Sequence, residues 1–179
     1  MSLSKEGLNV DRNAEHGAKP FVVIGVGNPL LGDDGVGIRV VEALMERDLP
    51  SWVQVIDAGT GGVTLLHLME GAAKALLVDA VSWGGPPGEI TRFRPEEVVS
   101  ACTSRGFSIH ASDLLDVLGL ARELGMCPEE VIIYGIQPRA VEQGMELSSE
   151  VSAAIPHVVD SVVAEIYQFS KNKIGGTSR

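Results

Sequence analysis

The stretch FVVIGVGNPLLGDDGVGIR, residues 21–39, contains the turn that decides the fold. Its first residues, 21–26, form an apolar run that is typical of a strand buried on both faces. The glycine turn that follows resembles a nucleotide-binding loop, but Leu30 stands where a dinucleotide site needs a third glycine. Asp33 stands where a P-loop needs lysine. The turn therefore presents two carboxylates, Asp33 and Asp34, and nucleotide binding is disfavoured.

The bulk composition limits the classes of protein to which the chain can belong. Its 179 residues, 45% of them apolar, suit one folded domain with a substantial core. The formal net charge of −10 argues against nucleic acid or an anionic membrane as partner, because both attract basic surfaces. Cys102 and Cys127 lie far apart and form no CxxC pair, which favours a reduced, cytoplasmic protein without disulfides.

The ends of the chain differ from its middle. Residues 1–20 are polar and contain no apolar signal core, so we expect a flexible extension there. We expect a single domain over residues 21–170 and a flexible tail over 171–179. No apolar run approaches the roughly 20 residues that a membrane-spanning helix needs.

Strand and helix patterns alternate along the chain. Strands are predicted at 21–26, 53–57, 75–80, 89–94 and 131–136, and helices at 35–48, 63–70, 111–124 and 148–169. This order predicts an α/β fold, a three-layer αβα sandwich around a mostly parallel five-stranded sheet. A breaker at 84–88 replaces the crossover helix before strand 89–94, so this edge strand can run antiparallel.

Acidic side chains follow three successive strands of this sheet. Asp33 and Asp34 follow the first strand, Asp57 ends the second, and Asp79 lies at the end of the third. The carboxyl ends of parallel strands meet at one edge of a sheet, and His110 lies on a loop that could reach the same edge. Carboxylates and one imidazole without a matching cation suit a divalent ion such as zinc or nickel.

Each of these residues also has a purely structural interpretation. Asp33 or Asp34 could cap the helix that begins near residue 35, and Asp33 is the better candidate for the cap. Asp57 could form a turn, and His110 alone could be an ordinary loop residue. Asp79 interrupts an apolar run, so a half-buried carboxylate there needs a partner, a hydrogen-bond cage or a metal.

One motif and its order along the chain resemble a known family. The segment GVGNPLLGDDGVG at 25–37 closely resembles the signature of the hydrogenase maturation endopeptidases. The resemblance continues through DAGTGG at 57–62, LVDA at 77–80, SIH at 108–110 and YGIQP at 134–138, and it covers roughly residues 21–168. It departs at Gln137, where many relatives have glutamate, and this change bears on substrate contacts or local charge.

The resemblance implies a function and a set of site residues. Members trim the C-terminal extension from the large-subunit precursor of nickel-iron hydrogenases after nickel insertion. By motif, the family's metal ligands and catalytic residues map onto Asp34, Asp79 and His110, and Asp57 is the candidate for a supporting carboxylate. The metal is expected to be nickel supplied in the substrate, with zinc or a similar ion as the alternative. A protein of this size and fold can act as a monomer.

Two other functions fit the same residues. A metal-binding maturation chaperone would use an acidic surface and a ligand triad to recognise the precursor and release it uncut. A related peptidase on the same scaffold would cleave a different protein. The sequence leaves both open, and a cleavage assay distinguishes them.

Overall fold

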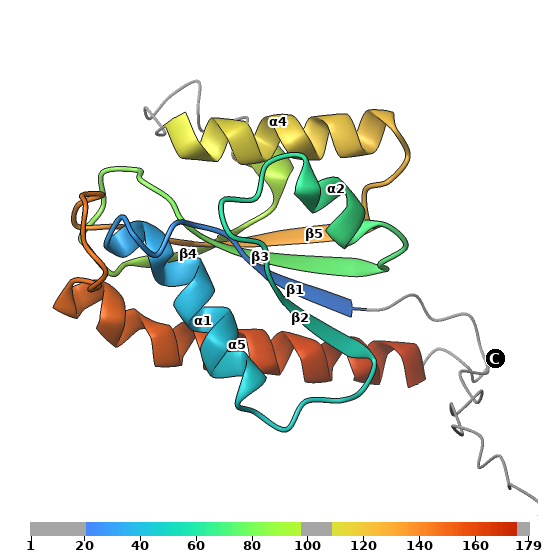
Figure 1. Cartoon of the computed structure of the whole chain (residues 1–179). Coiled ribbons are helices and arrows are strands. Elements are labelled where there is room, and N and C mark those ends of the chain that lie inside the picture. Colours follow the sequence, from blue (N-terminus) through green and yellow to red (C-terminus); the bar gives the residue numbers. More distant parts are fainter. Residues whose placement is uncertain (1–20, 98–108, 175–179) are drawn as a thin grey trace, which may run out of the picture.

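A computed structural model describes residues 21–97 and 109–174 of the chain, and it shows one mixed sheet (Figure 1). The strands are β1 (Phe21–Gly25), β2 (Val53–Asp57), β3 (Lys74–Ala80), β4 (Ile90–Phe93) and β5 (Glu130–Ile136). Their order is β2-β1-β3-β5-β4, in which only the β4–β5 pair is antiparallel. The predicted fold class and the antiparallel edge strand are therefore confirmed.

Helices cover both faces of the sheet (Figure 1). They are the 3₁₀ turn η1 (Asp33–Gly35) and the α-helices α1 (Val36–Met45), α2 (Thr64–Met69), α4 (Ile109–Glu123) and α5 (Ser149–Ile174). The core of one face joins α1 and α5 to the sheet, and the core of the other joins α2 and α4. Helix α5 continues past the predicted domain end at 170, whereas the extension predicted at 1–20 lies outside the described residues.

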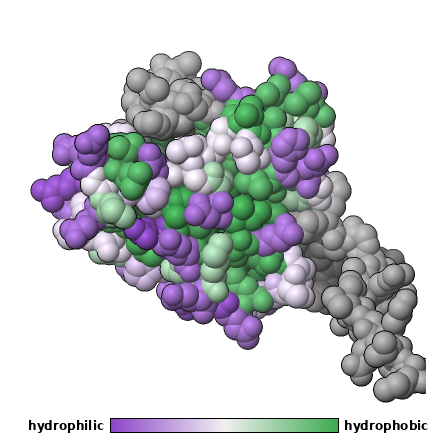
Figure 2. All heavy atoms as spheres, in the orientation of Figure 1, coloured by the Kyte–Doolittle hydropathy of each residue, from purple (hydrophilic) through white to green (hydrophobic). Residues whose placement is uncertain are grey.

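The sequence pattern explains the two cores. In α1, the apolar side chains of Val36, Val40 and Leu44 recur at helical spacing and are fully buried. Strand β3 is buried along its whole length, which is typical of a central parallel strand covered on both faces. In the view of Figure 2, apolar residues gather over the region of β1 and β2, with hydrophilic residues around them. No helix in the described part of the chain is both long and apolar enough to cross a membrane.

Glycines at the end of β1 and at the start of α1 let this helix approach the sheet closely. A Cβ atom added to Gly37 would lie 2.2 Å from the carbonyl oxygens of both Val26 and Val78. One added to Gly25 would lie 2.3 Å from the carbonyl oxygen of Gly37. Separations this short are impossible for a side chain, so the helix can contact β1 and β3 only through glycine. The glycine signature therefore serves backbone packing at the strand end.

We expect Gly37→Ala to destabilise the fold by about 1–3 kcal/mol or more, because two backbone carbonyls, one directly after β1 and one in β3, would have to move. Chemical denaturation followed by circular dichroism measures this change. Gly119→Ala in α4 is the matched control, because its Cβ would meet nothing within 4 Å. This control should be neutral or up to about 1 kcal/mol more stable. Equal stability of the two variants would contradict the packing role of Gly37.

Candidate active site

Two carboxylates line one cavity at the carboxyl edge of the sheet. Asp34 lies in η1, directly after the β1 turn, and Asp79 is the penultimate residue of β3. The cavity has a volume of about 320 Å³. Its lining residues are Val26, Gly27, Asn28, Leu31, Asp34, Thr60, Gly62, Leu65, Asp79 and Leu114. We call this space the acid cavity. Asp34 and Asp79 therefore lie at one edge of the sheet, as the order of the strands predicted.

The turn between β1 and η1 fixes the position of Asp34. Gly27 has a φ of 138°, and a Cβ atom there would lie 1.9 Å from the carbonyl oxygen of Asp34. The backbone N–H of Asn28 donates a hydrogen bond of 2.9 Å to Oδ2 of Asp34. Asn28 stabilises the same turn through its Oδ1, which accepts a hydrogen bond from the N–H of Leu30 (3.0 Å). Backbone groups therefore hold the Asp34 carboxylate in the acid cavity with little conformational freedom.

Asp79 lies in an environment that disfavours its charge. Its side chain is buried, and this burial is the largest cause that raises the pKa of Asp79 well above the ordinary value. The nearby negative charge of Asp34 raises the pKa further, while a hydrogen bond from the backbone of Ala80 lowers it in part. A carboxyl of this kind holds a proton more tightly than usual and gains from a nearby cation.

Asp33 does not cap a helix, contrary to prediction. Helix α1 begins after Gly35 with no side-chain cap, and the Asp33 carboxylate instead accepts hydrogen bonds from a distant segment. The donors are the N–H of Arg139 (2.8 Å), the N–H of Ala140 (3.4 Å), and the N–H (2.6 Å) and hydroxyl (2.9 Å) of Ser148. Asp33 therefore ties η1 to the segment that leads into α5.

Asp57 and His110 are not among the described residues that line the acid cavity. Asp57 is exposed, and its Oδ1 accepts a hydrogen bond from the N–H of Gly59 (2.8 Å), so it forms the predicted turn. His110 is the second residue of α4, which corrects its predicted place on the loop before that helix. Leu114, one helical turn later on the same helix face, lines the acid cavity. The side chain of His110 lies outside the described residues.

The metal site therefore remains a prediction. Among the side chains that the structure describes, no group of three or more His, Cys, Asp and Glu residues is arranged to hold a metal ion. Asp34 and Asp79 are among these side chains, and that of His110 is not. Two carboxylates at one cavity, with the charge of one raising the pKa of the other, match the donor set that a divalent ion prefers.

Gln137 departs from the family pattern, and the structure shows what its amide does. This buried side chain accepts hydrogen bonds through Oε1 from the backbone N–H groups of Trp83 (2.8 Å) and Gly85 (3.3 Å). Its Nε2 donates to the hydroxyl of Ser82 (3.4 Å) and the carbonyl oxygen of Pro138 (3.1 Å). Gln137 thus orders the segment that follows β3, a role that the sequence alone did not suggest.

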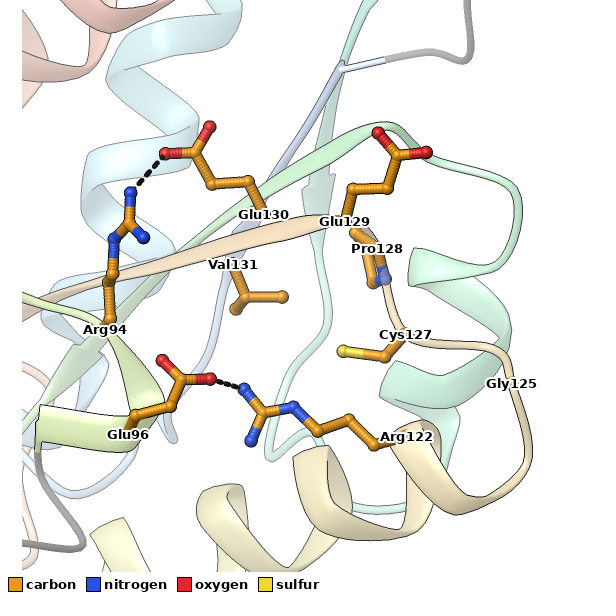
Figure 3. Close-up of a pocket in the computed structure, with 9 residues that line it drawn as sticks. All are labelled: Arg94, Glu96, Arg122, Gly125, Cys127, Pro128, Glu129, Glu130 and Val131. Atoms are coloured by element: carbon orange, nitrogen blue, oxygen red, sulfur yellow. Dashed lines mark hydrogen bonds and ion pairs between the residues drawn. The ribbon is translucent and has the colours of Figure 1, made fainter.

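A second pocket, of about 370 Å³, lies at the opposite end of the strands (Figure 3). The start of β5 forms part of its lining, and its two arginines are paired, Arg94 with Glu130 (3.4 Å) and Arg122 with Glu96. Burial is the main cause that raises the pKa of the Cys127 thiol, so this thiol is a poor nucleophile. The described residues of this pocket therefore offer paired charges and no activated thiol.

Comparison with known proteins finds matches among hydrogenase maturation proteases. A family model described as hydrogenase maturation protease matches residues 38–165. The hydrogenase 2 maturation protease of Escherichia coli is 37% identical over 82% of this chain and 90% of its own length. The hydrogenase expression/formation protein HupD of Rhodobacter capsulatus is 33% identical over 81% of this chain and 70% of its own length.

Solved structures show the same fold. The hydrogenase-maturating endopeptidase HybD from Escherichia coli superimposes with a TM-score of 0.74 at 34% identity, over 83% of this chain and 93% of that one. The [NiFe] hydrogenase maturation protease HybD from Thermococcus kodakarensis gives a TM-score of 0.66 at 27% identity, over 80% of this chain and 96% of that one.

Proposed function

This chain belongs to the hydrogenase maturation protease family, and from this membership we propose that it is an endopeptidase acting on a nickel-iron hydrogenase. Its substrate is the large-subunit precursor, from which it removes the C-terminal extension after nickel insertion, in the cytoplasm. The observation that carries the proposal is the pair of carboxylates, Asp34 and Asp79, at one cavity at the carboxyl edge of the sheet. Carboxylate oxygens at such a cavity are suitable ligands for a divalent metal ion.

The residues of the acid cavity suit a divalent cation. We propose that Asp34, Asp79 and His110 bind the nickel that the precursor brings with it, with zinc or a similar ion as the alternative. A cation between Asp34 and Asp79 would relieve the repulsion that raises the pKa of Asp79. His110 begins the helix whose Leu114 lines the cavity, so its backbone lies one turn from the site.

The same residues supply acid–base chemistry. A divalent ion bound there would polarise the scissile carbonyl or lower the pKa of the attacking water. As the alternative, Asp79, whose pKa is raised by burial and by the charge of Asp34, would act as general base for an attacking water while the metal only positions the substrate. The backbone N–H of Asn28 holds Asp34 in place. Asp57, beside the cavity-lining Thr60 turn, is proposed as a supporting carboxylate.

The glycine turn between β2 and α2 leaves room for a polypeptide. Thr60 and Gly62 line the acid cavity, and a Cβ atom added to Gly62 would meet nothing within 4 Å. An open backbone beside two carboxylates allows a substrate chain to approach closely. We propose that the scissile peptide bond lies along this turn.

The proposal is tested with purified protein and two forms of the precursor, loaded with nickel and free of nickel. Mass spectrometry of the products measures release of the C-terminal peptide. We expect the wild type to release the peptide from the nickel-loaded precursor only. The His110→Ala variant should release no peptide from either form. Equal release from both forms would contradict the role of nickel. Binding of the precursor without any release would favour a metal-binding chaperone, and release from another protein alone would favour a related peptidase.

A further inference from the structure

A groove of about 590 Å³ runs between α1 and α5, outside the acid cavity. We call it the α1–α5 groove; its lining residues are Arg39, Glu42, Ala43, Glu46, Met145, Glu146, Leu147, Ser152 and Ile155. Its apolar floor is formed by Ala43, Leu147 and Ile155, which are partly buried against the core of this face. The groove thus has an apolar floor between the two helices.

An exposed methionine lies at the mouth of the α1–α5 groove. Met145 is 64% exposed, although an apolar side chain of this size gains free energy when it is covered. Methionine is flexible and adapts to partners of varied shape, and it is used for this at binding surfaces. The position of Met145 therefore favours a polypeptide partner that covers it.

The charges around the α1–α5 groove are complementary to a basic partner. Three carboxylates, Glu42, Glu46 and Glu146, line it against the single guanidinium of Arg39. Arg39 is already paired with Glu42 at 3.0 Å, so the remaining rim is negative. An apolar floor with an acidic rim suits a segment that carries an apolar side chain between Lys or Arg residues.

The α1–α5 groove is linked through the 139–148 segment to the turn that carries Asp34. The N–H of Gly32 donates to the carbonyl oxygen of Gly144 (2.8 Å), and the N–H of Gly144 donates to that of Leu30 (3.0 Å). These bonds fasten the 139–148 segment beside the turn that carries Asp34. A further hollow, lined by Asp33 and by residues of this segment, shares Glu146 and Leu147 with the groove. The 139–148 segment therefore borders the groove and is hydrogen-bonded to the turn that precedes Asp34.

We propose that the α1–α5 groove binds a segment of the precursor that carries basic residues and an apolar side chain. The cleavage site of the same precursor molecule enters the acid cavity. This inference rests on the proposed function, and it adds a second contact away from the reacting bond. The contact lengthens the stay of the precursor on the protein and selects among precursors by their charge. It acts on binding and leaves the groups at the acid cavity unchanged.

The test compares two charge reversals of equal size in the full chain. The groove variant is E46K/E146K, and the matched control is D116K/E123K on α4, which covers the opposite face of the sheet. All four positions are exposed, so both variants should fold. Calorimetry with the nickel-loaded precursor measures Kd, and peptide release at saturating precursor measures kcat.

We expect the groove variant to weaken Kd at least about tenfold at low salt, with a smaller difference at high salt and an unchanged kcat. The control should keep Kd within about twofold of the wild type. Equal Kd for the two variants, in a protein that cleaves the precursor, would overturn this inference alone. Binding of the precursor by the wild type without cleavage would overturn the proposed function alone, and the Kd comparison would still decide the inference.

Discussion

The Asp79→Asn variant should be more stable than the wild type and inactive in peptide release. Asp79 is buried, and both its burial and the charge of Asp34 raise its pKa. Asparagine has nearly the same shape and carries no charge, so the unfavourable burial of a carboxylate disappears. At neutral pH and without added metal, we expect a gain on the order of 1 kcal/mol, or about 2–4 °C in Tm.

The gain should depend on pH in a defined direction. The pKa of Asp79 is raised in the folded state, so the native protein binds this proton more tightly than the unfolded chain does. Stability of the wild type therefore falls as pH rises from the ordinary carboxyl pKa of about 4 through the raised folded value. The advantage of Asp79→Asn should be absent at pH below about 4 and complete above the folded pKa.

Thermal denaturation at several pH values measures this effect, and Asp57→Asn is the matched control. Asp57 ends the neighbouring strand, is exposed, and can keep its bond from the N–H of Gly59 as asparagine. Its Tm should change little across the same pH range. Peptide release by Asp79→Asn should fall more than about 100-fold. If Asp79→Asn were less stable than the wild type at neutral pH, the carboxylate of Asp79 would not be unfavourable in the folded protein.

The neighbouring acids Asp33 and Asp34 should separate stability from activity. Asp33→Ala removes the acceptor of four hydrogen bonds and leaves the N–H groups of Arg139 and Ser148 unpaired in a partly buried place. We expect a loss of about 2–3 kcal/mol, or about 5–10 °C in Tm. The carboxylates of the acid cavity remain, so release at low temperature should persist.

Asp34→Ala should show the opposite pattern. It loses one hydrogen bond, from the N–H of Asn28, and it also removes the charge that raises the pKa of Asp79. Stability should therefore change by less than about 1 kcal/mol, while peptide release falls more than about 100-fold. Chemical denaturation measures the stability of both variants, and mass spectrometry measures their peptide release. A stable Asp33→Ala with lost release, beside an active Asp34→Ala, would reverse the assigned roles.

Local patterns in the sequence predicted the fold well, because strands and helices depend on the periodicity of nearby residues. The antiparallel β4 was predictable too, since the breaker at 84–88 leaves no room for a crossover helix. The role of Asp33 was not predictable, because its hydrogen-bond partners lie 106 to 115 residues further along the chain. A local rule assigned it to the nearest helix, whereas the tertiary structure uses it elsewhere.

In the candidate site, too, some features could be predicted from local sequence and others depend on the tertiary structure. The strand ends predicted that Asp34 and Asp79 would share an edge, because parallel strands place their carboxyl ends together. The hydrogen bonds of Gln137 could not be predicted, since they depend on how β5 lies beside the segment after β3. The metal-binding role of Asp34, Asp79 and His110, inferred from their residue types at the strand ends and from the resemblance, stays a prediction.

The order of strands in the sheet has a consequence for synthesis on the ribosome. Strand β3 pairs with β1 on one side and with β5 on the other, and β4 pairs only with β5. While the chain emerges from its amino end, the apolar residues of β3 therefore form an unprotected sheet edge until residues 130–136 appear. Such an edge invites pairing with other nascent chains. Slow translation between β3 and β5 should thus favour aggregation, and a chaperone that shields this edge should raise the yield of folded protein.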